Sequence, residues 1–314
     1  MLLQAVESVL GIALMLGVGF FLSRKGYMGE AATKLVSFLV TGVALPCYMV
    51  YNLTSGYDRA ALLALLPDIP APFVSVILCF LLGLLFAKIL KVPKSRFYAF
   101  ATMFAMPNTI FMGLPVNRAL FGEQSVPFVL VYYMATTLTF WTVCVNGIKK
   151  DGDPAQGRIF TASGLKKLLS PALIGFFAGV IIVLSGFDLK QNIGFLSDTL
   201  NYIGSMVTPL SMIFIGSVLQ KTDFRKLRFS RDMAAILIGK FVAAPLLAFA
   251  AALIFNVPRL AMDVFIVQAA MPILSQTAIV SKQYNADAEY AAVMVSLTTI
   301  LSLAVIPVVK IILT

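Results

Sequence analysis

The sequence predicts an all-α polytopic membrane protein with ten transmembrane helices, arranged as two inverted five-helix repeats. Three observations predict this class: the apolar composition, a proline break that occurs twice at a constant offset, and a one-sided distribution of Lys and Arg. Of the 314 residues, 60% are apolar and 12% are charged, and the mean hydropathy is +0.94. A soluble domain of this size cannot bury that much hydrocarbon, so the apolar surface must face lipid.

A membrane-spanning helix needs about 20 mostly apolar residues. Runs of this kind predict ten spans, at residues 3–22, 33–53, 71–90, 97–120, 126–147, 170–187, 194–219, 233–256, 261–283 and 289–312. The longest connection, residues 148–169, contains Lys, Asp, Gly and Pro and falls at the midpoint. We therefore expect a first repeat over residues 1–147, a cytoplasmic linker over 148–169 and a second repeat over 170–314.

The basic residues predict how the chain is oriented. Eighteen Lys and Arg residues lie in or beside the odd-numbered loops, and four lie in the even-numbered loops. Cytoplasmic loops carry the excess of Lys and Arg, so both termini are expected outside the cytoplasm. Because each repeat has an odd number of spans, the second repeat enters the membrane from the opposite side, which makes the repeats inverted.

The fourth and ninth spans carry the same break. Ala105-Met106-Pro107 recurs as Ala270-Met271-Pro272, and Pro93 recurs as Pro258, both 165 positions apart. Proline lacks a backbone N–H and clashes with the preceding turn, so each helix must kink or stop there. Interrupted spans at corresponding positions of two repeats point to a transport site, at which we expect the two crossover prolines Pro107 and Pro272 to meet.

Polar residues follow each break, at Asn108-Thr109-Ile110 and at Ser275-Gln276-Thr277. A helix that restarts exposes unpaired N–H groups and a partial positive charge, so two such ends can bind an anion without a charged side chain. The alternative is that both prolines only adjust helix packing. Because the breaks recur in repeat register, we favour a binding site.

Lys240 is a cation well inside the eighth span. It lies nine residues past Arg231, about 13 Å deep at 1.5 Å per residue. Ionisable residues at such depth are costly and point to function, either attraction of an anion or occupation of a cation's place. The alternative is a side chain that extends toward the interface.

A third pair of prolines, Pro46 and Pro209, is 163 positions apart in the second and seventh spans. The polar neighbours that could form a wall beside the broken helices are Tyr48, Asn52, Tyr202 and Ser205. Ordinary hydrogen bonding between helices explains these residues equally well.

Several chemistries lack the residues they need. The chain has no histidine, and its three cysteines, Cys47, Cys79 and Cys144, lie in apolar spans without metal-like spacing. We therefore expect no metal and no cofactor, and no enzyme. The net charge of +10 is distributed over short loops and forms no basic face, so nucleic acid is not expected as a partner.

Taken with ten spans and a short central loop, three features resemble the auxin efflux carrier family over the whole chain: Leu45-Pro46, Pro107-Asn108 followed by Gly113-Leu114-Pro115, and the broken ninth span. The short loop is similar to that of the prokaryotic branch, whose members include carriers for malonate, malate and related anions. The resemblance implies a fold like those of sodium/proton antiporters and bile-acid carriers. It further implies a scaffold of spans 1, 2, 6 and 7, a mobile transport domain of spans 3–5 and 8–10, and an elevator-type motion. It also implies that Asn108, Pro107 and Pro272 form the crossover site.

The leading hypothesis is a secondary transporter of small organic anions such as malonate, malate or auxin-like acids. One alternative is a membrane sensor or regulatory subunit, although no loop is long enough for a soluble output domain. Another is a cation antiporter, but such exchangers use carboxylates where this chain has Asn108 and Gln276. The expected partners are the anion and membrane lipid, and a homodimer is left open.

Overall fold

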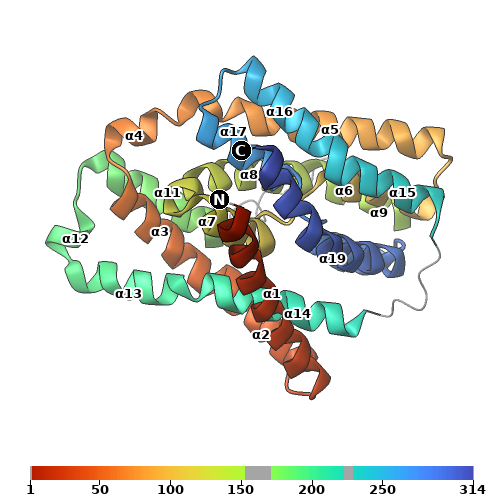
Figure 1. Ribbon diagram of the computed structural model, residues 1–314, viewed down its shortest axis with the longest axis horizontal. Coiled ribbons are helices and arrows are strands. Elements are labelled where there is room, and N and C mark those ends of the chain that lie inside the picture. The colour runs from red at the N-terminus through yellow and green to blue at the C-terminus, as the bar shows by residue number, and fades with distance from the viewer. Residues whose placement is uncertain (1, 153–170, 223–228, 314) are drawn as a thin grey trace.

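Every predicted span is helical in the structure, a computed structural model that describes residues 2–152, 171–222 and 229–313 (Figure 1). Helices satisfy all their backbone groups within one segment, which an apolar environment requires. Within these described residues, six helical segments are long and apolar enough to cross a membrane: Glu30–Gly56, Arg59–Ile89, Glu123–Gly152, Gly194–Lys221, Arg231–Ile254 and Ala288–Ile312. Shorter apolar helices cover Leu10–Arg24 and Pro171–Ser185. The ten-span inverted repeat itself stays a prediction.

The helix bounds follow the apolar runs closely. The first half contains α1 (Leu2–Arg24), α2 (Glu30–Phe38), η1 (Leu39–Ala44), α3 (Leu45–Gly56), α4 (Arg59–Leu63), α5 (Pro70–Ile89), α6 (Phe97–Ala105), η4 (Thr109–Gly113), α7 (Leu114–Phe121), α8 (Val126–Thr139), η6 (Phe140–Cys144) and α9 (Val145–Gly152). The second half contains α11 (Pro171–Ser185), α12 (Leu189–Asn192), α13 (Gly194–Ser205), α14 (Val207–Lys221), α15 (Arg231–Ile238), η9 (Gly239–Ala243), α16 (Ala244–Ile254), α17 (Arg259–Ala269), α18 (Gln276–Gln283) and α19 (Ala288–Ile312). Because α9 ends at Gly152, helix extends into the predicted linker. The rest of that linker lies outside the described residues.

The prolines act in two different ways. At Pro107 and Pro272 the helix stops and restarts, between α6 and η4 and between α17 and α18. At Pro46 the helix continues from Glu30 to Gly56, and the turn before the proline widens into the π-helical segment η1. The same arrangement precedes Pro115, after η4, and Pro245, after η9. A wide turn moves away the backbone carbonyl with which the proline ring would otherwise clash. The pattern of backbone hydrogen bonds changes locally, and the helix continues past the proline.

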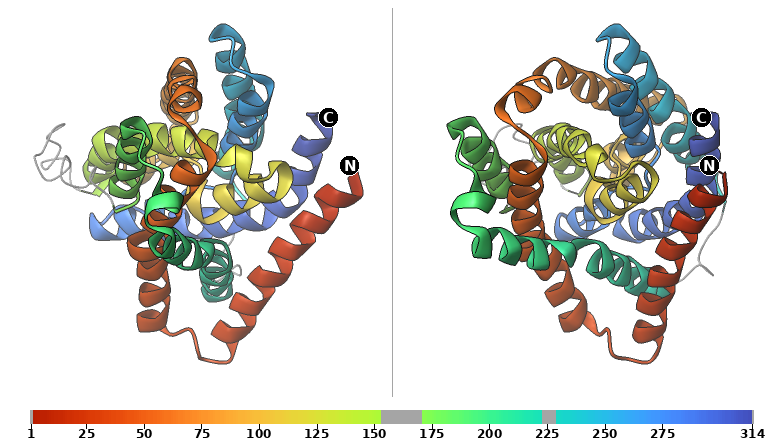
Figure 2. Two further views of the ribbon diagram at one scale, coloured as in Figure 1. Left: turned by 90° about the vertical axis from the view of Figure 1, so that its left-hand side faces the viewer. Right: turned by 60° about the vertical axis from the view of Figure 1, so that its left-hand side comes forward.

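The helices pack in two sets. In the first, α1 packs against α14, and α3 packs against both α11 and α13 (Figure 2). In the second, α5 contacts α6, α8 and α16, while α16 contacts α17 and α18 contacts α19. A large apolar cluster, from Ala71 to Ile148 and from Met233 to Val295, lies within the second set. Two smaller clusters join the sets.

Close backbone contact holds α1 against α14. A Cβ on Gly19 would lie 2.2 Å from the Ile213 carbonyl oxygen, and a Cβ on Gly216 would lie 2.1 Å from the Leu16 oxygen. Only glycine allows this approach. Small residues at a helix interface replace the hydrophobic driving force that lipid does not supply.

The described parts of the first and seventh loops meet at one end of the molecule, called the odd-loop end below. Ser23 Oγ donates to Gln220 Oε1 at 2.9 Å, and Lys221 Nζ donates to Thr33 Oγ1 at 2.7 Å. The opposite end holds the C-terminal residues, since Arg259 Nη2 donates to the Leu313 carbonyl. Both termini lie near each other in every view (Figures 1 and 2).

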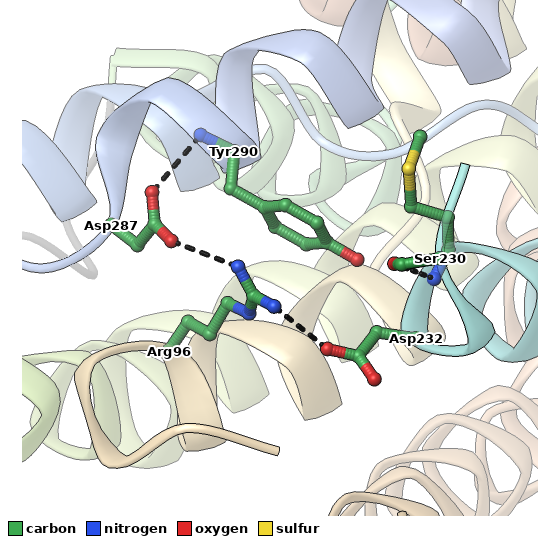
Figure 3. A network of polar contacts seen from close by, with 6 residues as sticks. Arg96, Ser230, Asp232, Asp287 and Tyr290 are labelled. Carbon is green, nitrogen blue, oxygen red and sulfur yellow. Dashed lines mark hydrogen bonds and ion pairs between the residues drawn. The ribbon is translucent and has the colours of Figure 1, made fainter. Parts of the chain in front are cut away.

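Arg96 joins three elements of the second set at the odd-loop end (Figure 3). Its guanidinium contacts Asp232 at the start of α15 (2.8 Å) and Asp287 before α19 (3.1 Å), and it stacks on the Tyr290 ring at 4.2 Å. Asp287 also caps α19 by accepting from the Tyr290 N–H. This network fixes the starts of α6, α15 and α19 relative to one another.

Asp151 caps a helix that is remote in sequence. Its carboxylate accepts from the Tyr98 N–H at 3.0 Å and the Ala99 N–H at 2.7 Å, in the first turn of α6. Burial raises the pKa of Asp151 to about 6, against the opposing effect of these N–H donors. The cap thereby ties α9 to the beginning of the first broken helix.

Candidate functional site: a cavity at the crossing of two broken helices

The two proline breaks lie against each other as an antiparallel pair. The Asn108 N–H donates to the Pro272 carbonyl at 2.7 Å, and the Leu274 N–H donates to the Met106 carbonyl at 3.0 Å. Pro107 and Ile273 form an isolated bridge between them. The N–H and C=O groups of extended backbone need hydrogen-bond partners when they are buried, and here the backbone of each break provides partners for the other. The crossing therefore brings four half-helix ends together.

A third helix supports the crossing. The Ile273 N–H donates to Thr298 Oγ1 at 3.1 Å, and that hydroxyl in turn donates to the Met294 carbonyl within α19. Thr298 is fully buried. Its role is not predictable from the sequence, because one threonine in an apolar span carries no local signal.

Asn108 links the two half-helices that restart. Its Oδ1 accepts from the Phe111 N–H at 3.2 Å, which caps η4, and its Nδ2 donates to Ser275 Oγ at 3.1 Å. Because Ser275 Oγ accepts this hydrogen bond, its own hydrogen is available for another acceptor. Ser275 forms no side-chain cap on α18, so the first-turn N–H groups of α18 lack that partner.

A cavity of about 390 Å³ lies beside the crossing. Three regions line it: the crossing, α8 with η6, and the facing residues of η1, α3 and α11. The described lining residues are Thr41, Leu45, Asn108, Thr109, Ile110, Phe111, Tyr133, Thr136, Thr137, Phe140, Trp141, Pro171, Ala172, Leu274, Ser275 and Gln276. None of these is charged. The volume is in the range of small-molecule sites.

The structure brings most of the predicted crossover residues to this cavity: Asn108, Thr109, Ile110, Ser275 and Gln276 all line it. Two others lie elsewhere. Thr277 is fully buried behind the lining. Lys240 is also fully buried, and its Nζ donates to the Ala105 carbonyl at 3.1 Å, at the end of α6.

The four predicted wall residues separate into two pairs. Tyr48 Oη donates to Glu123 Oε2 at 2.9 Å, and Asn52 Nδ2 contacts the same oxygen at 3.4 Å. Glu123 also pairs with Arg118. By contrast, Tyr202 is 75% exposed and Ser205 donates only to the Tyr202 carbonyl of its own helix. Neither pair lines the cavity.

The lining residues of the fifth span were missed by the sequence analysis. Tyr133, Thr136, Thr137 and Trp141 come from α8 and η6. A signal was present, since Trp141 is the chain's single tryptophan and follows a threonine-rich stretch in an apolar run. A search for helix breaks does not detect it.

The chain is similar to known proteins over nearly its whole length. Residues 4–310 match a family described as membrane transport protein. An uncharacterized transporter of Methanocaldococcus jannaschii is 26% identical over 309 residues, covering 96% of each chain. An uncharacterized transporter of Methanothermobacter thermautotrophicus is 26% identical over 307 residues, again covering 96% of each chain. A match over nearly the whole length, together with the helices long enough to cross a bilayer, identifies the chain as an integral membrane protein. It belongs to the membrane transport protein family, that of the auxin efflux carriers.

Proposed function

We propose that the protein is a secondary transporter of small organic anions, such as malonate, malate or auxin-like acids, and that the anion binds at the crossing. The observation that carries this proposal is the cavity beside two crossed breaks, lined by hydrogen-bond donors and by no described charged residue.

The donors at the crossing suit a carboxylate. The half-helix N-termini at η4 and α18 provide N–H groups and a partial positive charge. Asn108 Nδ2 keeps one hydrogen beyond its bond to Ser275, and the Ser275 hydroxyl keeps its own. Gln276, at the start of α18, adds an amide that can also donate. A cation antiporter would need a carboxylate where these donors lie.

The packing supports a ten-span inverted repeat with a scaffold and a mobile domain. The first helix set, α1 with α14 and α3 with α11 and α13, corresponds to the expected scaffold. The second set corresponds to the transport domain, and the Arg96 network and the large apolar cluster would hold it together as one body. The cavity lies between the two sets, where an elevator-type motion would carry a bound anion along the scaffold.

The distribution of Lys and Arg supports one orientation of the protein in the membrane. The described parts of the first and seventh loops meet at one end, which would face the cytoplasm and leave both termini outside, in a bacterial inner membrane. At the other end, Tyr48 and Asn52 of α3 contact Glu123 of the second set. We infer that this contact closes the outer end while the cavity extends toward the cytoplasmic end, where Pro171 begins α11.

A thermal-shift screen of the purified protein tests the proposal. The probes are malonate, malate and indole-3-acetate, each compared with its uncharged methyl ester. A ligand that binds only the folded state at 100 times its Kd adds about 2.7 kcal/mol of stability. We expect at least one acid, and none of the esters, to raise the melting temperature, and uptake of that labelled acid into proteoliposomes. If no acid stabilises the protein beyond its ester, the proposal is wrong.

A further inference from the structure

Lys240 is a cation buried in the interior of the fold. The side chain is fully buried within the large apolar cluster of the second helix set. Among the described residues it forms no ion pair with a carboxylate, and its Nζ donates to the Ala105 carbonyl at 3.1 Å. A charge taken out of water without a charged partner costs several kcal/mol, so an inert position would favour an apolar residue.

The partner of Lys240 is the end of a broken helix. Because Pro107 stops α6, the last carbonyls of α6 lack the N–H groups of a following turn. Thr102 O accepts from the Met106 N–H at 2.8 Å, and Phe104 O accepts from Cys79 Sγ at 3.8 Å. Ala105 O accepts from Lys240. The ammonium therefore lies at the partially negative end of α6.

The backbone around Lys240 is shaped to bring it there. Lys240 lies in the π-helical segment η9, which precedes Pro245. A Cβ on the neighbouring Gly239 would lie 2.3 Å from the Phe104 ring, so η9 approaches α6 more closely than another residue would allow. The wide turn accommodates Pro245, and the close contact at Gly239 places Lys240 directly against the end of α6.

In secondary transporters with broken helices, the C-terminal half-helix ends and unwound carbonyls are where a coupling cation binds. We propose that Lys240 is the resident cation of this crossing. Its ammonium takes the place that a sodium ion would occupy at the end of α6, so transport requires no inorganic cation. Its charge also attracts the anion, which binds on the other side of the break. This inference rests on the proposed function for the identity of the anion.

Two kinds of substitution separate the charge from the hydrogen bond. Lys240→Gln keeps an N–H donor for the Ala105 carbonyl but removes the charge, whereas Lys240→Met removes both. Lys221→Met is a matched control, since Lys221 also donates to a neighbouring oxygen, Thr33 Oγ1, but lies at the exposed end of α14. A residue that only caps α6 would tolerate Gln and fail with Met.

The first measurement uses the unsubstituted protein without any carboxylate. Its melting temperature is compared in sodium, lithium, potassium and choline chloride at equal ionic strength. We expect the same value in all four salts. A rise specific to sodium, lithium or potassium would show a cation site that Lys240 does not fill, and would overturn the inference. This outcome is independent of whether a carboxylate is the substrate.

The second measurement is the affinity for malonate, malate and indole-3-acetate by titration calorimetry. Removing the positive charge removes its through-space attraction for the anion, so Lys240→Gln and Lys240→Met should weaken binding alike, by about tenfold, while Lys221→Met leaves it unchanged. Parent-like affinity in Lys240→Gln would overturn the role of the charge. If the parent itself binds none of the acids, the proposed function fails, and the salt comparison still decides whether Lys240 replaces a cation.

Discussion

Replacing Asn108 by aspartate separates the two tasks of this side chain. Asn108 caps η4 through Oδ1 and donates to Ser275 through Nδ2. Aspartate preserves an oxygen for the Phe111 N–H but removes the amide donor and places a negative charge in the cavity. The substitution therefore leaves the helix start intact and reverses the electrostatic character of the site.

The structure allows both effects to be estimated. Aspartate and asparagine are equally good caps, and a negative charge suits a helix N-terminus, but position 108 is buried, so the ionised carboxylate of Asn108→Asp should lower the folding stability below that of the parent. Asn108→Ala should lose about 1 kcal/mol with the cap. A hydrogen bond to a charged ligand contributes about 1.5–3 kcal/mol, so Ala should bind the acid about ten- to a hundredfold more weakly. Aspartate should bind at least as weakly as Ala because it repels the anion.

The assay pairs a melting curve with calorimetric titration of the acid found in the screen, at pH 8. Asn108→Ser is the matched control, because serine caps as well as asparagine but lacks the amide, and it should show parent-like stability with weakened binding. The expected order of affinity is Asn above Ser and Ala, with Asp no better than Ala. Parent-like affinity in Asn108→Asp would refute the placement of the anion at this break.

Three further predictions follow from the same geometry. Pro107→Ala restores a backbone N–H and lets α6 run through the break, so proteoliposome uptake should fall although no substrate contact is removed; parent-level uptake would show that the break is dispensable. Burial raises the pKa of Asp151 from 3.8 to about 6. The folded state therefore binds the proton more tightly than the unfolded state does. The parent should lose stability relative to Asp151→Asn as the pH rises from about 4 to about 6, with no further loss above pH 6. Parallel pH profiles of the two melting temperatures would contradict this prediction. A cysteine introduced at Lys190 should react with an impermeant maleimide added to intact cells and one at Lys91 should not; the reverse pattern would invert the predicted topology.

The sequence was sufficient to place the helices and the breaks. Helix bounds depend on apolar runs, and Pro107 and Pro272 end a helix for a local chemical reason. The effect of Pro46 was harder to predict, because a proline inside a helix can be accommodated by a wide turn such as η1. Whether the helix ends at a proline or continues through a wider turn depends on the residues that pack around it. The hydropathy of the sequence does not reveal this packing.

The residues of the candidate site could be predicted where polar residues directly follow a helix break. They could not be predicted where the outcome depends on the direction in which a side chain points. Asn108 and Ser275 were found from their positions after Pro107 and Pro272. Depth alone placed Lys240 near the crossing but could not tell that its side chain faces the end of α6 rather than the cavity. Tyr202 was selected for its polarity, yet polarity does not say which face of a helix points outward.

The uncharged lining of the cavity limits how finely the protein can choose among acids. With shape as the main difference between two homologous acids, one methylene more or less changes the free energy of binding by about 1–3 kcal/mol, a factor of about ten to two hundred. A neutral analogue is rejected far more strongly, because it leaves the converging donors of η4 and α18 unpaired. Such a cavity discriminates strongly between acids and neutral compounds but only weakly between one acid and another. Which acid crosses the membrane in the cell is then decided largely by the concentrations of competing acids on the two sides.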